Sequence, residues 1–169
     1  MNYNVDILIA VSASQGPVMQ AVLQNRYHIQ HLLGQGGMGT VWMAQDMRLN
    51  GRACVIKQLR EDFFRDEDKQ RAISFFEREI DMLIKLQHPY IVGILDRFKE
   101  DDKYFLVMEY VMGEDFHTMM QRREGQPYEE EEVVRRAQEI CEVLEYLHGQ
   151  EPPVIYRDLK PSNIMVNVK

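Results

Sequence analysis

The sequence contains little cysteine, and this scarcity excludes two kinds of protein. Its 169 residues include two cysteines, Cys54 and Cys141, which lie far apart in apolar segments. A disulfide framework needs a larger set of cysteines, and a zinc site needs closely spaced ligands. We therefore expect both thiols to be reduced and to serve as packing residues, as in proteins of a reducing compartment.

Long apolar runs are also lacking. No window of the sequence approaches the roughly 18 apolar residues of a transmembrane helix. Residues 7–11 form a short apolar run with no Lys or Arg before it, which is too short and wrongly flanked for a signal peptide. We expect a cytoplasmic chain without a membrane segment.

Positive charge is in deficit. The chain has 20 Lys and Arg against 27 Asp and Glu, a formal net charge of -7. This surplus of negative charge repels nucleic acid and anionic membranes, so we expect no nucleic-acid partner. Hydrophobic residues make up 45% of the chain, which suits one globular domain or two small lobes and argues against a disordered tail.

The first half of the sequence is patterned as β-strands. Residues 1–24 carry no motif, and we expect an extension or a loose strand there. Residues 27–32 alternate as in a strand, a glycine cluster turns the chain, and residues 40–43 are again strand-like. Asn50-Gly51 is a strong two-residue turn signal before the apolar strand 53–57. These segments predict a three-stranded antiparallel meander.

A helix and two further strands are predicted next. Residues 67–86 are charged and helix-favouring, with apolar residues at helical spacing, and His88-Pro89 ends this helix. Residues 90–95 and 104–108 are two short strand-like runs, separated by a polar turn over residues 99–103.

Beyond Gly113 the period becomes helical. We expect a short helix over residues 116–120, a break at Gly125-Gln126-Pro127, and a long helix that opens with the acidic residues 129–132. The acidic run reads most simply as a solvated helix start. The apolar face of the long helix comprises Val133, Ala137, Ile140, Cys141, Leu144 and Leu147.

A glycine-rich pattern is the first candidate binding motif. Gly34, Gly36 and Gly39 leave room for backbone amides to approach phosphate oxygens. Alone, the pattern also fits a plain hairpin turn or a dinucleotide-binding fingerprint. Strand formers follow Gly39, and Lys57 rather than an acidic ribose-binding residue lies downstream, so the dinucleotide interpretation is disfavoured.

Lys57 is the second candidate. A lone strand lysine is usually a solvated edge residue, but this one ends an apolar strand and can project beneath the glycine loop. It needs a carboxylate to orient it, and the following helix offers Glu77 and Glu79. At about 100° per residue, Glu79 shares a face with Leu83 and Leu86, whereas Glu77 points about 200° away. We predict a Lys57–Glu79 ion pair.

Together these motifs resemble a known enzyme family. The glycine loop, Lys57, Glu79, His88-Pro89 and residues 156–163 (Tyr-Arg-Asp-Leu-Lys-Pro-Ser-Asn) occur in the order and spacing of eukaryotic-type (Hanks-type) serine/threonine protein kinases. The loop looks most like that of bacterial members.

The resemblance covers residues 27–169 and implies an α+β protein-kinase fold. The expected parts are an N-terminal extension (1–24), an N-lobe with a five-stranded antiparallel sheet and one main helix (25–108), a hinge (109–113) and part of a C-lobe (114–169). The C-lobe part would hold the first helices and the catalytic loop.

The resemblance also implies the site. Asp158 would position the substrate hydroxyl as base, Lys160 would contact the transferred phosphate, and Asn163 would bind magnesium. ATP and Mg²⁺ are the implied cofactors, and the protein substrate stays open. The implied catalytic residues are Asp158, Lys160, Lys57 and Glu79. The implied nucleotide-binding residues are Gly34, Gln35, Gly36, Gly37, Met38, Gly39, Val41, Val55, Lys57, Met108, Glu109 and Val111.

Departures from the family pattern bear on activity. Tyr156 replaces the usual His, Val55 replaces the usual Ala over the adenine ring, and the family's Asp-Phe-Gly segment would follow Lys169. Without that Asp, we expect very weak catalysis by this chain alone. The alternatives are a non-catalytic nucleotide-binding or interaction module and a non-functional gene fragment.

The long helix raises a second expectation. In the family its apolar face packs on later helices, and burying about six such side chains contributes about 10 to 18 kcal/mol. We therefore expect the segment after Gly113 to expose an apolar surface through which the chain associates with another chain.

Overall fold

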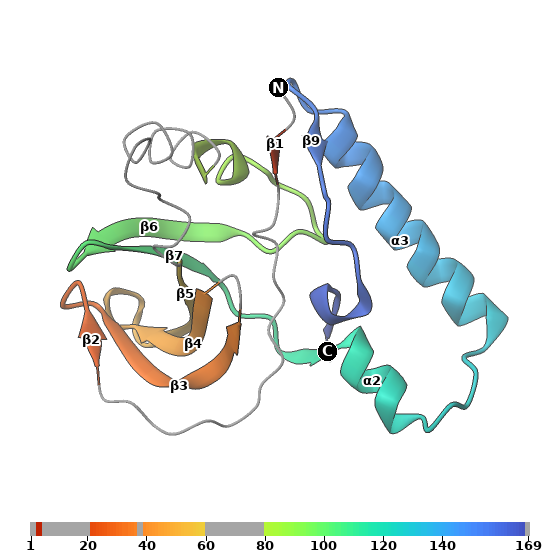
Figure 1. The fold of residues 1–169 in the computed structure, drawn as a ribbon, viewed down its shortest axis with the longest axis horizontal. Helices are drawn as coiled ribbons and strands as arrows, with labels where there is room; N and C mark the ends of the chain where they lie inside the picture. The colour runs from red at the N-terminus through yellow and green to blue at the C-terminus, as the bar shows by residue number, and fades with distance from the viewer. Residues whose placement is uncertain (1–2, 5–20, 37–38, 60–79, 168–169) are drawn as a thin grey trace.

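The computed structural model describes residues 3–4, 21–36, 39–59 and 80–167. Its main element is an antiparallel sheet in the first half of the described chain, followed by two helices and a set of short strands (Figure 1). Glu79, Gly37 and Met38, all predicted to belong to the site, lie outside the described residues.

The sheet has six strands in the order β2-β3-β4-β5-β7-β6. Five are long, as predicted, and the sixth is a two-residue strand at the edge. Their bounds are β2 Val22–Leu23, β3 Tyr27–Gly36, β4 Gly39–Asp46, β5 Arg52–Gln58, β6 Ile94–Glu100 and β7 Lys103–Glu109. Every pairing is antiparallel. The α+β class and the antiparallel sheet expected from the sequence are confirmed.

Strand β4 extends further than predicted, to Asp46, and the connection to β5 is correspondingly shorter. Strand β4 ends at Asp46, whose carboxylate accepts the N–H of Arg48 at 3.0 Å and caps a short 3₁₀ helix, η1 (Met47–Leu49). Asn50 and Gly51 follow with φ values of 53° and 75°. The predicted turn at Asn50-Gly51 is confirmed, because both residues have positive φ, and the capped 3₁₀ turn precedes it.

The strand predicted over residues 90–95 was also misplaced. Strand β6 begins at Ile94 and continues through charged residues to Glu100, and the turn is confined to Asp101 and Asp102. Along β6 half-buried and exposed residues alternate, so Arg97 and Lys99 occupy the outer face, whereas Asp96 shares the half-buried face with Phe98. The apolar residues before it, Ile91 and Val92, instead pack against core clusters.

The sheet is curled so that its two edges meet. Arg26 donates to both oxygens of Asp46, at 2.8 Å from Nε and 2.6 Å from Nη2, and its Nη1 lies 2.7 Å from Asp96 Oδ2. The Tyr27 hydroxyl donates to the same Asp96 oxygen at 2.6 Å. We call Arg26, Tyr27, Asp46 and Asp96 the edge clasp. It joins the start of β3 to β6, and strands β4, β5 and β7 lie between these two in the sheet.

An apolar cluster lies within this curl. Tyr27 stacks on Phe98 with ring centroids 5.6 Å apart, and Phe98 stacks on Phe105 at 5.0 Å. Cys54 is buried in the same cluster, as predicted, and burial raises the pKa of its thiol to about 11. The thiol is therefore protonated at neutral pH and serves as a packing group.

A second cluster joins the sheet to the C-terminal segments. It buries Ile80, Leu83 and Leu86, at and after the end of a helix, with Leu106 of β7, Leu147 and Val154. Beside it, the N–H of Gln87 donates to the Tyr146 hydroxyl at 2.8 Å, and the His88 and Tyr146 rings lie 5.0 Å apart.

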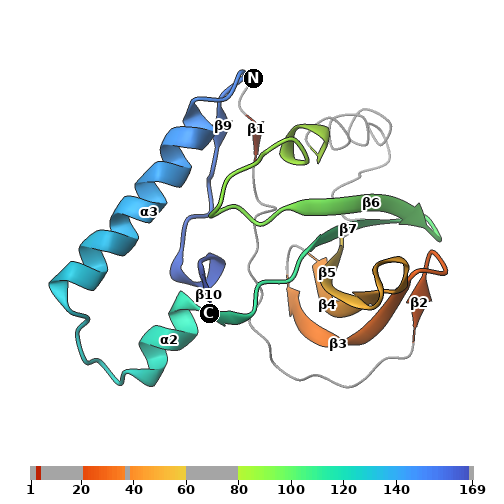
Figure 2. The same ribbon diagram turned by 180° about the vertical axis from the view of Figure 1, so that it is seen from behind.

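The C-terminal elements run along this junction (Figures 1 and 2). Strand β8 (Gly113–Asp115) leads into α2 (Phe116–Arg122), and α3 (Glu130–His148) follows. Both helices agree with the predicted segments. Strand β9 (Val154–Ile155) pairs in parallel with β1 (Tyr3–Asn4), and β10 (Met165–Asn167) pairs with β8.

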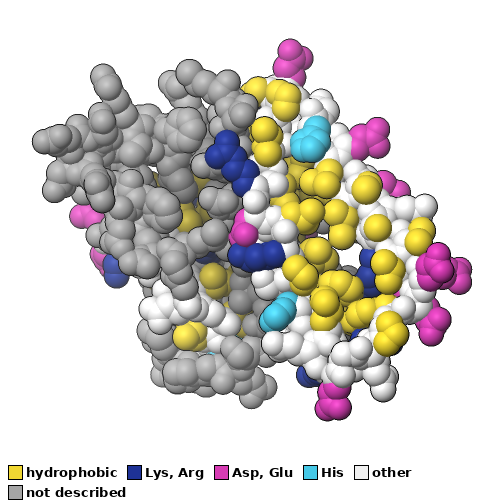
Figure 3. All heavy atoms as spheres, turned by 45° about the vertical axis from the view of Figure 1, so that its right-hand side comes forward, with side chains coloured by type: hydrophobic (Ala, Val, Ile, Leu, Met, Phe, Trp, Pro, Cys, Tyr) yellow, Lys and Arg dark blue, Asp and Glu magenta, His cyan; other side chains and the backbone are white. Residues whose placement is uncertain are grey.

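Helix α3 does not bury the apolar face read from the sequence. Within α3, all of which the structure describes, Leu147 is the buried residue, and Val133 is 50% exposed. Ala137 and Cys141 are exposed too, so the prediction that Cys141 packs in a core is wrong for this chain. Figure 3 shows hydrophobic side chains gathered over this side of the molecule. Among the described residues, no helix is both long and apolar enough to span a membrane.

The edge clasp predicts a pH-dependent stability. Hydrogen bonding from Arg26 holds the pKa of the Asp46 carboxyl below its usual 3.8. A lowered native pKa means that this stabilisation is present above pH 3.8 and is lost as the pH falls through the native value. We expect Asp46→Asn to lower the free energy of unfolding by about 2 kcal/mol at pH 7, and the difference from wild type to shrink below pH 3.8.

Urea unfolding at pH 7 and pH 3 measures this difference. Asp102→Asn is the matched control, because Asp102 pairs with Lys99 at 2.8 Å in an exposed turn, where such a pair contributes little. Equal effects of the two substitutions at pH 7 would contradict a special role for the clasp.

Candidate active site

The loop between β9 and β10 carries the predicted catalytic groups. Val154 of β9 is buried and anchors one end. Pro161 starts a 3₁₀ helix, η3 (Pro161–Asn163), a position where proline's missing N–H costs nothing. The N–H of Asn163 donates to the Lys160 carbonyl at 2.9 Å. At the other end, the Phe116 N–H donates to the Ile164 carbonyl at 2.8 Å, which ties the loop to the start of α2.

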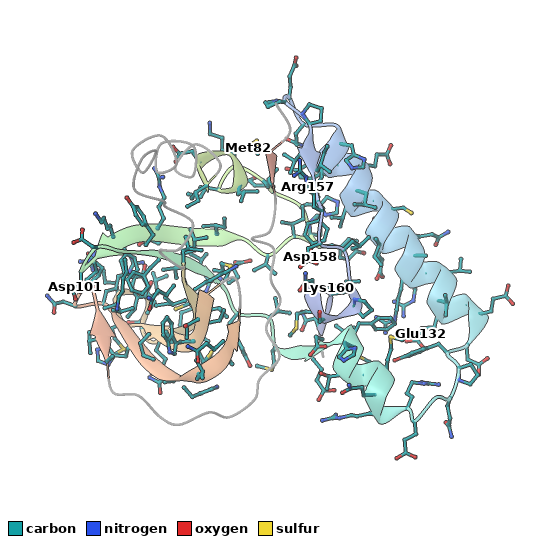
Figure 4. The ribbon with its side chains drawn as sticks, in the orientation of Figure 1. Met82, Asp101, Glu132, Arg157, Asp158 and Lys160 are labelled. Carbon is teal, nitrogen blue, oxygen red and sulfur yellow. The ribbon has the colours of Figure 1, made fainter. Side chains whose placement is uncertain are left out.

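Asp158 is held by two side chains from its own loop. The Asn163 Nδ2 donates to the Asp158 backbone carbonyl at 2.8 Å and to Asp158 Oδ2 at 2.9 Å. The Lys160 ammonium lies 2.6 Å from the same carboxylate oxygen. The structure thus brings together three of the residues predicted for the site, and Figure 4 shows Asp158 and Lys160 neighbouring each other on the loop.

This arrangement fixes the charge state of Asp158. The Lys160 ammonium, followed by the Asn163 amide, lowers the pKa of the Asp158 carboxyl. The Asp158 side chain keeps 27% of its surface exposed, so the carboxylate remains accessible from outside the loop. An ionised, accessible carboxylate is able to accept a proton.

Lys57 occupies the middle of the sheet. It pairs with Val41 of β4 on one side and Leu106 of β7 on the other, and the residue is 2% exposed. The solvated edge position that a lone strand lysine usually takes is therefore excluded. The predicted partner, Glu79, lies outside the described residues.

An apolar cluster lines this part of the sheet near the glycine loop. It buries Val41, Val55 and Met108, three residues predicted to contact the nucleotide, together with Leu33. The sequence reading omitted Leu33, although its place in a strand directly before Gly34 was an available signal.

The glycine loop is the turn between β3 and β4. Gly36 pairs with Gly39 across the hairpin. Gly39 has a φ of +129°, and a Cβ there would lie 2.0 Å from the Gln58 carbonyl oxygen. Glycine is thus required at this position both by its backbone conformation and by the close approach of β5.

The predicted hinge follows the end of β7. The Glu109 N–H donates to the Gly93 carbonyl at 2.9 Å. Beyond Val111, Gly113 approaches β10 so closely that a Cβ would lie 2.0 Å from the Val166 carbonyl oxygen. Asp115, 4% exposed, caps α2 by accepting the Thr118 N–H at 2.9 Å. These contacts, which the sequence reading did not identify, tie the hinge to the end of the catalytic loop.

The described residues supply only part of the ligand set that a magnesium ion needs. Asn163 uses its Nδ2 to hold Asp158, which leaves its Oδ1, a suitable oxygen ligand, to face a cation. In the part of the chain that the structure describes, no three His, Cys, Asp or Glu side chains cluster as a metal site.

Comparison with known proteins identifies the class. A model of the protein kinase domain matches residues 27–169, so the chain belongs to the protein kinase family. The resemblance predicted from the motifs is confirmed.

Two similar curated proteins are bacterial serine/threonine kinases. The chain is 39% identical to serine/threonine-protein kinase pkn3 of Myxococcus xanthus over 142 residues, 83% of this chain and 24% of the relative. It is 37% identical to serine/threonine-protein kinase B of Synechocystis over 145 residues, 85% of this chain and 25% of the relative. It thus spans about a quarter of the length of these curated relatives.

Solved structures agree with this assignment. The crystal structure of the Mycobacterium tuberculosis PknI kinase domain superimposes with a TM-score of 0.73 at 26% identity. The match covers 89% of this chain and 58% of the solved chain.

The Asp158 contacts lead to a test by NMR titration. We expect Lys160→Met to raise the pKa of the Asp158 carboxyl most, because the ammonium is the largest cause of its lowering, and Asn163→Ala to raise it less. The pKa of Glu132, lowered by Arg136 on α3, should stay unchanged in both variants and is the control within the same spectra. An unchanged Asp158 pKa in Lys160→Met would show that the ion pair is absent in solution.

Proposed function

We propose that this chain carries the nucleotide-binding and proton-accepting groups of an ATP-dependent serine/threonine protein kinase. The observation that supports this most directly is the convergence of Lys160 and Asn163 on Asp158, in a protein kinase family member. The proposed site combines these three residues with Lys57 and the glycine loop.

The proposed reaction is phosphoryl transfer from ATP to a protein hydroxyl. Asp158 orients a serine or threonine hydroxyl and accepts its proton as the oxygen bonds to the γ-phosphorus. The bond from that phosphorus to the β,γ-bridging oxygen breaks, and ADP leaves with the electron pair. Lys160 then exchanges its contact with Asp158 for the negative charge of the transferring group.

The nucleotide is proposed to lie under the β3–β4 turn. Leu33, Val41, Val55 and Met108 supply an apolar wall for adenine, and the backbone of residues 109–111 supplies polar groups for its edge. Buried Lys57 faces the phosphates in this proposal. Magnesium, when bound, neutralises phosphate charge, and Asn163 is the residue proposed to hold it.

The domain boundaries follow from this assignment. Residues 25–108 form the N-lobe, 109–113 the hinge and 114–169 the C-lobe part, with residues 1–24 as an extension. The Gln87–Tyr146 contact joins the two lobes in this division, and the antiparallel β8–β10 pair ties the end of the hinge to the C-lobe part.

Arg157 is proposed to bind a phosphorylated regulatory residue. Its side chain is exposed on the loop beside Asp158 (Figure 4), and an arginine fork suits a phosphate group. Phosphorylation elsewhere in the kinase would then act on the loop through Arg157.

We propose that turnover by this chain alone is slow. Magnesium is bound through one or two carboxylates together with substrate phosphates, and Asn163 offers an amide oxygen only. The alternative function is a non-catalytic nucleotide-binding or interaction module, which the exposed apolar side of α3 favours. A non-functional fragment is the remaining alternative.

Binding and transfer separate these functions. Calorimetric titration with ATP, with and without MgCl₂, reports binding, and transfer of labelled phosphate to serine, threonine and tyrosine peptides reports chemistry. Slow, magnesium-dependent labelling of serine or threonine peptides is expected. Binding with no labelling at all would favour the non-catalytic module, and no binding would favour the non-functional fragment.

Substitutions of Lys57 and Asp158 test their proposed roles in ATP binding and in proton transfer separately. We expect Lys57→Met to weaken ATP binding about 10- to 100-fold, because a charge-assisted contact to phosphate is lost. Asp158→Asn should bind ATP normally and reduce transfer by at least about 100-fold, because the base is lost. Thermal melting of both variants controls for folding. Unaltered transfer by Asp158→Asn would reject the assigned base.

A further inference from the structure

The side chain of Glu109, which the proposed reaction does not use, is held in place at the end of β7. Its Oε1 lies 3.1 Å from Nη2 of Arg52, the first residue of β5. The carboxylate of Glu109, two residues before Val111, is therefore held in position by a residue of another strand. The ion pair is partly exposed, at 53% for Arg52 and 44% for Glu109.

Gly93 supports Glu109 from a second direction. A Cβ on Gly93 would lie 3.2 Å from Glu109 Oε2 and 3.3 Å from its Cδ, so the glycine leaves the room that this carboxylate occupies. The Gly93 carbonyl also accepts the Glu109 N–H at 2.9 Å. Both the side chain and the backbone of Glu109 thus contact this one residue.

The third support is the sheet itself. Glu109 pairs with Cys54 in the β5–β7 ladder, and Cys54 is fully buried in the core. The backbone of Glu109 is consequently held between β5 and Gly93, and its carboxylate between Arg52 and Gly93.

We propose that Arg52, Gly93 and Glu109 form a hinge clamp that positions the backbone of residues 109–111 against the adenine edge of ATP. Arg52 is a positioning residue in this arrangement, since it acts through Glu109. The inference rests on the proposed nucleotide-binding function and adds a residue to it. Because the hinge clamp lies beside residues 109–111, we expect its loss to weaken contacts with adenine rather than contacts with the phosphates.

Arg52→Met tests the clamp with three ligands. A partly exposed ion pair changes an equilibrium by about 1.4- to 5-fold, so the variant should bind ligand weaker by a factor in this range. Calorimetry should give the same factor for adenosine, ADP and ATP, because all three share adenine. Loss of a positive charge acting at long range would instead weaken ATP most and leave neutral adenosine unchanged.

Lys99→Met is the matched control. Lys99 forms a similarly exposed ion pair, 2.8 Å from Asp102, in the β6–β7 turn, at the end of β7 away from Glu109. Its substitution removes the same charge from the same sheet and should leave adenosine affinity unchanged. Equal weakening of adenosine binding by both substitutions would overturn the clamp.

Two further variants guard against a purely structural effect. Arg52→Glu combined with Glu109→Arg restores the pair with reversed charges and should recover most of the adenosine affinity lost in Arg52→Glu. Gly93→Val should displace the Glu109 carboxylate and weaken adenosine and ATP binding by a common factor. Thermal melting of each variant accompanies the titrations.

The outcomes separate the clamp from the proposed function. If wild-type protein binds adenosine and ATP and Arg52→Met binds both equally well, the clamp is wrong and the nucleotide site stands. A lowered melting temperature with unchanged affinities has the same meaning. If wild-type protein binds neither ligand, the proposed function fails and the clamp fails with it.

Discussion

The two hydrogen bonds from the Asn163 amide to Asp158 are the constraint on which the site depends. One goes to the backbone carbonyl and the other to the carboxylate, so a single side chain sets both the path of the loop and the direction of the acid. Pro161 starts the turn that places Asn163 there, and the Lys160 ammonium lowers the pKa of the Asp158 carboxyl. The chemistry of Asp158 is therefore built from residues within six positions of it, and local sequence is enough to form it.

The Asp158–Asn163 loop must also be held near the segment predicted to bind the nucleotide. The β8–β10 pair makes this connection. Strand β10 begins directly after Ile164, and its partner β8 begins at Gly113, the last residue of the predicted hinge. Gly113 allows the two backbones to touch, so the end of this segment and the end of the Asp158–Asn163 loop are held together. Lys57 lies in a central strand whose place is fixed by β4 and β7. Asp158 and Lys57 are thus positioned by separate elements, the β9–β10 loop and strand β5.

The sequence predicted the features that depend on spacing within one segment. The strands around the glycine loop, both C-terminal helices and the Asp158–Asn163 loop all have periodic or fixed local patterns, and they were found. The features that were missed depend on distant residues. Strand β6 contains Asp96, whose charge is acceptable in a strand because Arg26 and Tyr27 bind it from β3's start. The extension of β4 to Asp46 was also missed, and Asp46 is held by the same Arg26 and caps the turn that follows. The need for glycine at positions 93 and 113 becomes evident only when the residues that pack against them, which are distant in sequence, are known.

The sheet and helix α3 differ in how much of their apolar surface is buried. The sheet closes on itself through the edge clasp and buries a cluster of aromatic and aliphatic side chains within the curl. Helix α3 buries Leu147 near its C-terminal end, whereas Val133 and Val134 near its start are about half exposed at 50% and 49%. Local opening free energy follows the apolar contacts that opening breaks, so the first turns of α3 are the less stable part of that helix. Leu147, Tyr146 and β9 lie at its firmly held end, and the catalytic loop begins there. The loop therefore takes its position from the sheet side of the molecule, and a protein that covers the exposed side of α3 would stabilise the helix without having to build the site.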